Sequence, residues 1–202
     1  MLFRPTHIRL WLDSDYTVSA EFMHAFFQAS STSLRHLSLR LSHDDAASDL
    51  AADFHLVAHG LETLSLTITQ SDESLDSLVV QCSSLKRLEL WCPPDYASAF
   101  LSAVSNRLDE IAAALANPAT IHQLVIIRGA VRRSRALDSS QQTAAPLFVA
   151  LRAPAFSALR QLVFQDISRN EFDQLALGNE LDPLHKECEA REIDLRFHGP
   201  EA

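Results

Sequence analysis

Apolar residues recur along the chain in a six-residue pattern, with leucine or a similar residue at the first, fourth and sixth positions. Five copies match in full and begin at Leu34 (LRHLSL), Leu61 (LETLSL), Leu85 (LKRLEL), Ile121 (IHQLVI) and Leu159 (LRQLVF). Two weaker copies flank them, PTHIRL from Pro5 and AREIDL from Ala190. Successive copies begin between 24 residues (Leu61 to Leu85) and 38 residues (Ile121 to Leu159) apart. Repetition at this interval predicts a stack of similar units.

The last four residues of each copy predict a β-strand, because alternate residues of a strand point to opposite faces. The fourth and sixth positions then face a core, and the first position marks an inward turn into the strand. One such strand cannot bury its apolar side alone, whereas stacked strands form a parallel sheet with a continuous apolar column behind it. The residues expected in that column are Leu37, Leu64, Leu88, Leu124 and Leu162.

The intervals between the strands predict helices that cover the apolar side of the sheet. Apolar residues lie at helical spacing in residues 21–29, 47–59, 74–82 and 96–117. Residues 130–146 are the exception, because this polar stretch predicts an irregular insert. The expected fold class is therefore α/β, with a single domain over residues 1–202.

The LxxLxL spacing resembles that of the leucine-rich repeat family, and the irregular periods with helical returns are most similar to the repeats of fungal F-box proteins. The resemblance extends from about Pro5 to Phe197. It implies a leucine-rich repeat solenoid, which is a curved parallel sheet of about seven strands with helices on its convex side. We expect the chain to be the repeat portion of a longer architecture, or a partner to cover one end of the stack.

The chain departs from the family pattern at the turns after the strands. Family members usually carry asparagine or cysteine three positions after the third leucine. The residues found there are Ser42, Thr69, Pro93, Gly129 and Ile167. We therefore expect variable turns in place of a regular asparagine ladder.

Outward residues at the third, fifth and seventh positions would line the concave face of such a solenoid. Both tryptophans of the chain, Trp11 and Trp91, fall at the seventh position. Tryptophan and arginine are enriched at interface hot spots, because they offer large contact areas or several hydrogen bonds. The predicted protein-binding residues are Trp11, Arg40, Arg87, Glu89, Trp91, Val125, Ile127 and Val163. The alternative is that the tryptophans pack on neighbouring strands and cover the sheet.

The same rule assigns outward positions in the weak seventh copy. Ile193 and Leu195 match the fourth and sixth positions of the pattern. Glu192, Asp194 and Arg196 would therefore point outward at the third, fifth and seventh positions.

Composition limits the classes of partner. The chain of 202 residues has 47% hydrophobic and 21% charged residues, as expected for a globular protein, and a net charge of −9. This charge argues against nucleic acid and anionic membranes as partners. A basic cluster on the insert could bind an acidic partner, accept a phosphate, or simply keep a loop solvated. It consists of Arg128, Arg132, Arg133 and Arg135.

The cysteines indicate the redox compartment. Cys82, Cys92 and Cys188 form no CxxC pair and are odd in number, so we expect small buried residues in a reducing compartment, the cytoplasm or the nucleus. No stretch approaches the roughly 20 apolar residues that span a bilayer.

The motifs of catalysis and of cofactor binding are missing. The four glycines form no GxSxG elbow, GxGxxG turn or phosphate loop. His55 and His59 are four residues apart on a predicted helix, but HLVAH lacks the glutamate of a catalytic zinc motif. We therefore expect a protein that is not an enzyme and has no cofactor and no metal site.

These patterns predict a non-catalytic protein that binds another protein on its concave face. The resemblance to F-box proteins implies substrate recognition for a ubiquitin ligase, with a Skp1-type adaptor as a further partner if the chain belongs to a longer F-box protein. The alternative is a regulatory inhibitor that occludes an enzyme, similar to ribonuclease-inhibitor-like repeat proteins.

Overall fold

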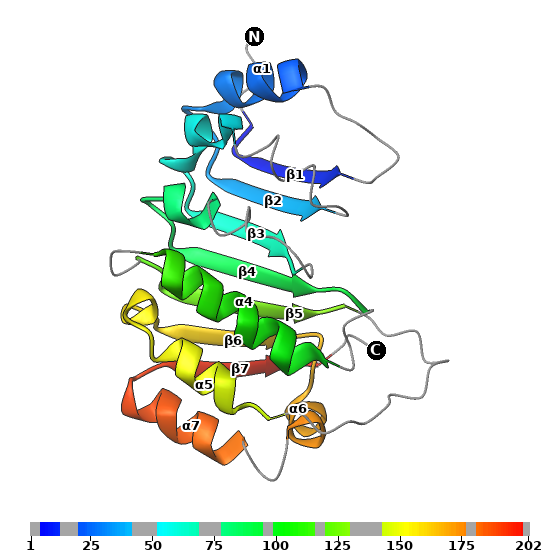
Figure 1. Cartoon of the computed structure of the whole chain (residues 1–202), viewed down its shortest axis with the longest axis vertical. Helices are drawn as coiled ribbons and strands as arrows, with labels where there is room; N and C mark the ends of the chain where they lie inside the picture. The colour runs from blue at the N-terminus through cyan, green and yellow to red at the C-terminus, as the bar shows by residue number, and fades with distance from the viewer. Residues whose placement is uncertain are drawn as a thin grey trace.

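The residues that the structure describes form an α/β fold built on one seven-stranded sheet (Figure 1). The structure is a computed structural model that describes residues 5–12, 20–41, 52–68, 78–94, 99–115, 120–129, 143–176 and 181–199. All neighbouring strands are parallel and follow one another in chain order. The strands are β1 (His7–Leu12), β2 (His36–Leu41), β3 (Thr63–Thr67), β4 (Arg87–Cys92), β5 (Gln123–Arg128), β6 (Gln161–Gln165) and β7 (Asp194–His198). The predicted strand number and parallel order are confirmed.

Helices lie on one face of the sheet, and Figure 1 shows α4 and α5 in front of it and α7 beyond β7 at the lower end. They include helical residues 52–58 and 78–81. The labelled helices are α1 (Ala20–Ser30), α4 (Phe100–Ala114), α5 (Ala145–Leu151), the short 3-10 helix η2 (Pro154–Phe156), α6 (Arg169–Leu175) and α7 (Leu181–Ala190). The helices expected over residues 21–29 and 96–117 are therefore present as α1 and α4. Residues 47–51, 74–77, 96–98 and 116–117 lie outside the described ranges.

The insert expected over residues 130–146 ends earlier than predicted. Residues 130–142 lie outside the described ranges, and α5 begins at Ala145. Pro146 stands in the first turn of this helix, where its missing N–H group is not needed. Leu147 then turns into the core and is fully buried. Proline and the apolar residues after it therefore end the insert.

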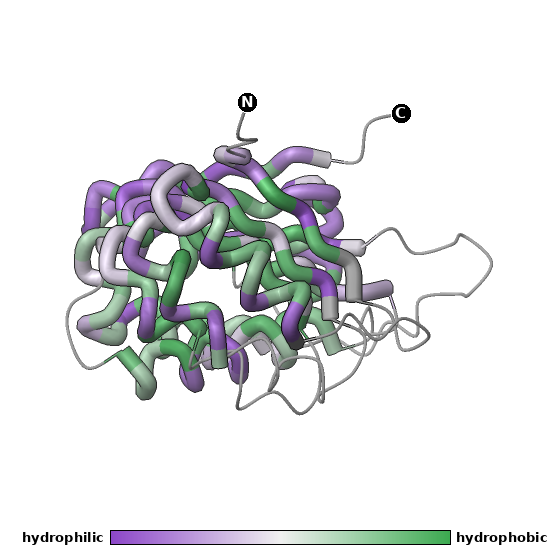
Figure 2. Tube along the Cα trace, turned by 90° about the horizontal axis from the view of Figure 1, so that it is seen from above, coloured by the Kyte–Doolittle hydropathy of each residue, from purple (hydrophilic) through white to green (hydrophobic). Residues whose placement is uncertain are grey.

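The core lies between the sheet and the helices. Figure 2 shows hydrophobic and hydrophilic stretches interleaved along the chain. Buried and partly exposed residues alternate along β4, whereas β5 and β6 each have three successive buried residues. The predicted column is confirmed, since each of its five leucines is at most 1% exposed. Phenylalanines from the helical side fill the space opposite this column, and they include Phe27, Phe54, Phe100, Phe156 and Phe172.

Successive strands begin with the same backbone hydrogen bonds. The N–H groups of Arg35 and His36 both donate to the carbonyl oxygen of Thr6. The same pair of bonds joins residues 62 and 63 to Arg35, residues 86 and 87 to Glu62, residues 122 and 123 to Lys86, and residues 160 and 161 to His122. The repeat in the sequence therefore corresponds to a repeat in backbone geometry.

The seventh strand pairs two residues further along than the sequence pattern predicts. Asp194 pairs with Gln161, so Leu195 and Phe197 hold the fourth and sixth positions. The physical reason lies in the entry turn, where Glu192 has a φ of 57° and Ile193 is buried before the strand begins. A shift of two residues preserves the facing of the strand. The predicted outward position of Glu192 is thus wrong, and His198 joins the outward set at the other end.

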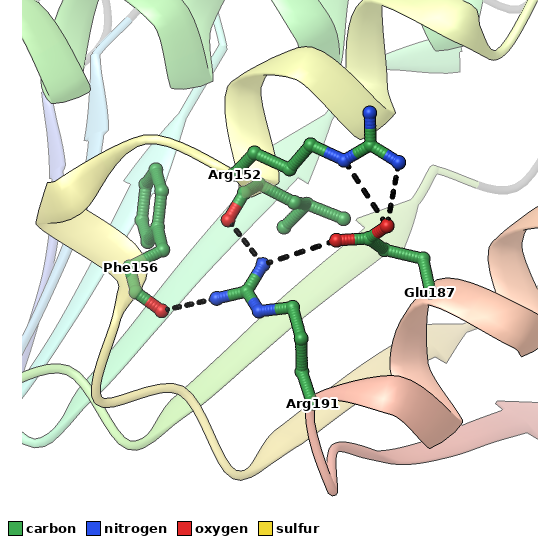
Figure 3. Close-up of polar contacts among 5 residues, drawn as sticks. Arg152, Phe156, Glu187 and Arg191 are labelled. Carbon is green, nitrogen blue, oxygen red and sulfur yellow. Dashed lines mark hydrogen bonds and ion pairs between the residues drawn. The ribbon is translucent and has the colours of Figure 1, made fainter.

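An arginine and glutamate cluster joins α7 to the ends of α5 and η2 (Figure 3). Arg191 Nη1 donates to the carbonyl oxygen of Leu151 at 2.6 Å, and its Nη2 donates to that of Phe156 at 2.8 Å. Carbonyl groups at helix ends lack intrahelical donors, so one guanidinium caps two helical segments. Arg152 Nη2 donates to Glu187 Oε2 at 2.6 Å, and this hydrogen bond lowers the pKa of Glu187.

Candidate protein-binding site

The face of the sheet opposite the helices presents three rows of side chains, which we call the outer face. The entry row, at the third position of each copy, contains His7, His36, Thr63, Arg87, Gln123, Gln161 and Asp194. The middle row, at the fifth position, contains Arg9, Ser38, Ser65, Glu89, Val125, Val163 and Arg196. The exit row contains Arg40, Thr67, Trp91, Ile127, Gln165 and His198, and the backbone of Trp11 holds the corresponding register position on β1. The pattern therefore brings the predicted binding residues to one face.

A chain of side-chain hydrogen bonds crosses the entry row from β4 to β7. Arg87 Nη1 donates to Gln123 Oε1 at 2.9 Å, Gln123 Nε2 donates to Gln161 Oε1, and Gln161 Nε2 donates to Asp194 Oδ2 at 3.2 Å. Each glutamine accepts from one neighbour and donates to the next, so all the amides point the same way.

Ion pairs hold both ends of this chain. Arg87 Nη2 lies 2.6 Å from Glu89 Oε1, and Arg196 Nη2 lies 2.6 Å from Asp194 Oδ2. We call these six hydrogen-bonded residues the polar ladder, which consists of Glu89, Arg87, Gln123, Gln161, Asp194 and Arg196. Its polar groups are largely used within the protein.

Two residues of the predicted site are more buried than expected. Val125 is 1% exposed and Val163 is 7% exposed, so the expectation of exposed aliphatic contacts at these positions is wrong. The pairing explains this, because Val125 lies between Glu89 and Val163 on the neighbouring strands. It also lies between the longer side chains of Gln123 and Ile127 along its own strand. The valines thus fill the space beside the polar ladder.

Arg40 and Trp91 meet across β3. The guanidinium carbon of Arg40 lies 4.3 Å from the centroid of the Trp91 ring, a cation–π contact. Thr67, which lies between their strands, is only 5% exposed. Burial, and secondly the charge of Arg9, lower the pKa of Arg40. Trp91 is half-buried and keeps part of its surface accessible, so its role in binding stays a prediction.

The second tryptophan can be placed only through its backbone. Trp11 pairs with Arg40 in the register of β1 and β2. Its side chain lies outside the described residues, so the predicted contact of Trp11 stays a prediction.

A hollow of about 400 Å³ opens on the outer face over β1 to β4. Its side-chain lining consists of His7, Arg9, His36, Ser38, Thr63, Ser65, Arg87 and Glu89, with Ile8 and Leu37 beneath. Short hydroxyl residues create it, because Ser38 and Ser65 stand in the row that Val125 and Val163 fill further along the sheet. Sequence reasoning by residue type missed this hollow. The available signal was the short side chain at the fifth position of two successive copies.

The rim of the hollow contains one arginine–glutamate pair, Arg87 with Glu89, and three further basic residues, His7, His36 and Arg9. Glu89 accepts from both Nε and Nη2 of Arg87, at 2.7 and 2.6 Å. The rings of His7 and His36 stack with centroids 3.8 Å apart and planes at 8°. Burial, and secondly His7, lower the pKa of His36, so this ring is neutral at pH 7. Arg9 is exposed and retains its charge.

The structure corrects the prediction for one member of the basic cluster, Arg128. Arg128 is the last residue of β5, pairs with Cys92 and is 6% exposed, so it is not a solvated loop residue. Its Nε has no hydrogen-bond partner among the residues that the structure describes. Arg132, Arg133 and Arg135 lie outside the described residues.

The cysteines are buried as predicted. Cys82, Cys92 and Cys188 are 8%, 1% and 2% exposed. Burial raises the pKa of Cys82 and of Cys92 to about 12 and that of Cys188 to about 11. Their thiols are therefore protonated and poorly nucleophilic at neutral pH.

None of the helices in the described ranges combines the length and the apolar character that crossing a membrane requires. Comparison with protein-family models and with curated proteins gives no match. The outer face, with its hollow over β1 to β4, is therefore the candidate protein-binding site.

Proposed function

We propose that this protein is a leucine-rich repeat solenoid that binds a partner protein, without catalysis, on the outer face of its sheet. The observation that carries the proposal is the hollow over β1 to β4, with Arg40 and Trp91 in the neighbouring exit row. Recognition sites are concave and combine apolar surface with a few polar groups, and arginine and tryptophan are frequent hot-spot residues. The repeated strands and strand entries support the solenoid.

The distribution of hydrogen bonds favours the β1 to β4 half of the face over the other half. Gln123 and Gln161 already satisfy each other within the polar ladder, so a partner that contacted them would have to replace existing bonds. Desolvating polar groups without new partners reduces affinity. Around Ser38 and Ser65 a partner would instead contact hydroxyl groups that make no side-chain hydrogen bond within the described part of the chain.

The resemblance to F-box proteins supports a more specific role as the substrate-recognition repeats of a ubiquitin ligase. In that role a Skp1-type adaptor would bind an F-box elsewhere in a longer protein. The buried cysteines support a reducing compartment, the cytoplasm or the nucleus. This role rests on analogy of fold, which is weaker support than the geometry of the site.

The proposal is tested with the double variant Arg40→Ala/Trp91→Ala and quantitative affinity purification. We expect the wild-type chain to retain a stoichiometric partner and the double variant to retain at least tenfold less. The melting temperature should stay within about 2 °C, because both side chains are partly exposed. A control, Val149→Ala, removes an apolar side chain that is 64% exposed on α5 and should retain the partner.

The outcomes separate the alternatives. A partner that binds the double variant as well as wild type would exclude this part of the outer face. A large fall in melting temperature would show that Trp91 mainly covers the sheet. Retention of a ligase adaptor together with a target supports the ligase role, whereas retention of a single enzyme, inhibited in the complex, supports the inhibitor role.

A further inference from the structure

The hollow carries an excess of positive charge although the whole chain has a net charge of −9. Among its lining residues, Glu89 has the only carboxylate, and Arg87 neutralises it through two hydrogen-bonding nitrogens. Arg9 adds a charge that no carboxylate among the lining residues neutralises. Arg40 lies in the adjacent exit row, and its charge and that of Arg9 repel each other. The local field therefore favours an anion.

The hydrogen-bonding groups of the hollow point to the same chemistry. Ser38, Thr63 and Ser65 are half-buried, and their hydroxyls make no hydrogen bond with the part of the chain that the structure describes. Arg9 supplies guanidinium donors beside them. An ionised carboxylate is purely an acceptor, with two oxygens that can take several donors at once. Charge-assisted bonds of this kind are the strong ones in recognition.

The size of the hollow and the total charge of the chain narrow the occupant. A volume of about 400 Å³ is enough for one or two side chains of a bound segment. A nucleic acid would bring a continuous run of phosphates toward a chain with a net charge of −9, which repels it at long range. A single carboxylate on a partner protein experiences chiefly the local positive field, because screening weakens distant charges.

We propose that the hollow is a recognition pocket for an aspartate or glutamate side chain on an exposed segment of the partner. The inference rests on the proposed function and specifies its chemistry. Arg9 pairs with the carboxylate at the rim, and the hydroxyls of Ser38 and Ser65 donate to it from the floor.

The experiment uses the full chain and three pools of fluorescein-labelled nonapeptides. The pools are randomised except at two alternate central positions, which are Glu in one pool, Gln in the second and Lys in the third. Fluorescence polarisation should show that the Glu pool binds at least tenfold more tightly than the Gln pool. The Lys pool should bind most weakly.

Matched variants then locate the binding. Arg9→Gln should reduce the affinity for the Glu pool to that for the Gln pool. Arg169→Gln removes the same charge from an exposed position on α6 and should leave the affinity within twofold of wild type. Ser65→Val, which fills the floor of the hollow, should weaken the Glu pool as Arg9→Gln does. Circular dichroism checks that each variant is folded.

Several results would overturn the inference. Equal binding of the Glu and Gln pools would show that charge is not read, and equal losses in Arg9→Gln and Arg169→Gln would show non-specific attraction. Displacement of the Glu pool by oligothymidylate at equal concentration would indicate a nucleic-acid site. Absence of binding by any pool would also reject the acidic pocket. The capture experiment with Arg40→Ala/Trp91→Ala would still decide the proposed function separately.

Discussion

The outer face changes character at β4, and the two sides of this boundary differ in how they use the same backbone. Toward the carboxyl terminus, the polar ladder runs from Glu89 to Arg196 and connects its side chains into a continuous chain. Toward the amino terminus, a hollow of about 400 Å³ replaces the ladder. The strands pair in the same way on both sides, so side chains alone make one half closed and the other open.

The length of the middle-row side chain explains the difference. Val125 and Val163 fill the space beside the ladder and are themselves buried. Ser38 and Ser65 occupy the same row on β2 and β3, two or more strands away from these valines. Their short side chains leave space between the entry row and the exit row. A few short side chains are therefore enough to open a hollow on a sheet whose strands all pair in the same way. The remaining positions then serve to hold the face together.

The largest expected change in the free energy of unfolding lies on the helical side of the half that carries the polar ladder, which we call the closed half. Arg191→Met removes a charged donor from the carbonyl oxygens of Leu151 and Phe156, which end two helical segments. Hydrogen bonds from charged groups contribute about 1.5 to 3 kcal/mol each, so we expect a loss of about 3 kcal/mol in the free energy of unfolding. Urea denaturation monitored by circular dichroism measures it.

The control for this prediction lies in the same cluster. The side chain of Arg152 pairs with Glu187 but is 63% exposed, whereas that of Arg191 is 22% exposed. Exposed ion pairs contribute little to stability, so Arg152→Met should lower the free energy of unfolding far less than Arg191→Met does. Equal losses for the two variants would show that the capped carbonyls contribute little.

A second, smaller effect comes from exchanging the residue types of the two halves. Val125→Ser leaves a hydroxyl in a site that is 1% exposed and should lower the free energy of unfolding by about 2 kcal/mol. Ser65→Val places a valine at a half-exposed position and should change it by less than about 0.5 kcal/mol. Urea denaturation of both variants compares them directly. If Ser65→Val were as destabilising as Val125→Ser, the hollow would be an essential packing feature and not an open site.

Most of the fold could be predicted because the sequence repeats its inward positions faithfully. The LxxLxL copies from Leu34 to Leu159 identified six strands in correct register when combined with the weaker copy at Pro5. The last copy failed by two residues, because Ile193 imitates a strand position while it belongs to the turn that contains Glu192. The motif records which residues are apolar but not the backbone angle at which the strand begins.

The site was harder to predict because exposure depends on lateral neighbours. The outward direction of Val125 and Val163 follows from the pattern, but their burial depends on the residues two positions along and one strand across. Residue type favoured Trp91, and the structure adds its contact with Arg40. The hollow at Ser65 exists because short side chains leave its space unfilled. The frequencies of residue types at hot spots give no information about such an unfilled space.

The smallest expected effect concerns the stacked histidines at the edge of the open half. The pKa of His36 is lowered from 6.5 by burial first and by His7 second, while the carboxylates of Glu62 and Glu89 oppose this and Arg87 adds to it. In the unfolded chain neither burial nor His7 lowers the pKa of His36. The unfolded state therefore binds more protons than the folded state as the pH falls below about 6.5. The stability due to neutral His36 is thus complete above that pH and decreases as the pH falls toward the folded value.

His36→Gln should therefore make the free energy of unfolding fall less steeply between pH 7.5 and 5.5 than it does in wild type. We choose this window because the carboxyl groups with lowered pKa, such as Glu187, titrate below it. His122→Gln, at an exposed position at the entry to β5, should keep the wild-type slope. Affinity for the acidic peptides should change in the opposite sense and rise as the pH falls, because protonated His36 adds charge to the hollow. Parallel slopes in all three proteins would show that the histidine stack does not sense pH, and would leave Arg9 as the charge that distinguishes the open half from the closed one.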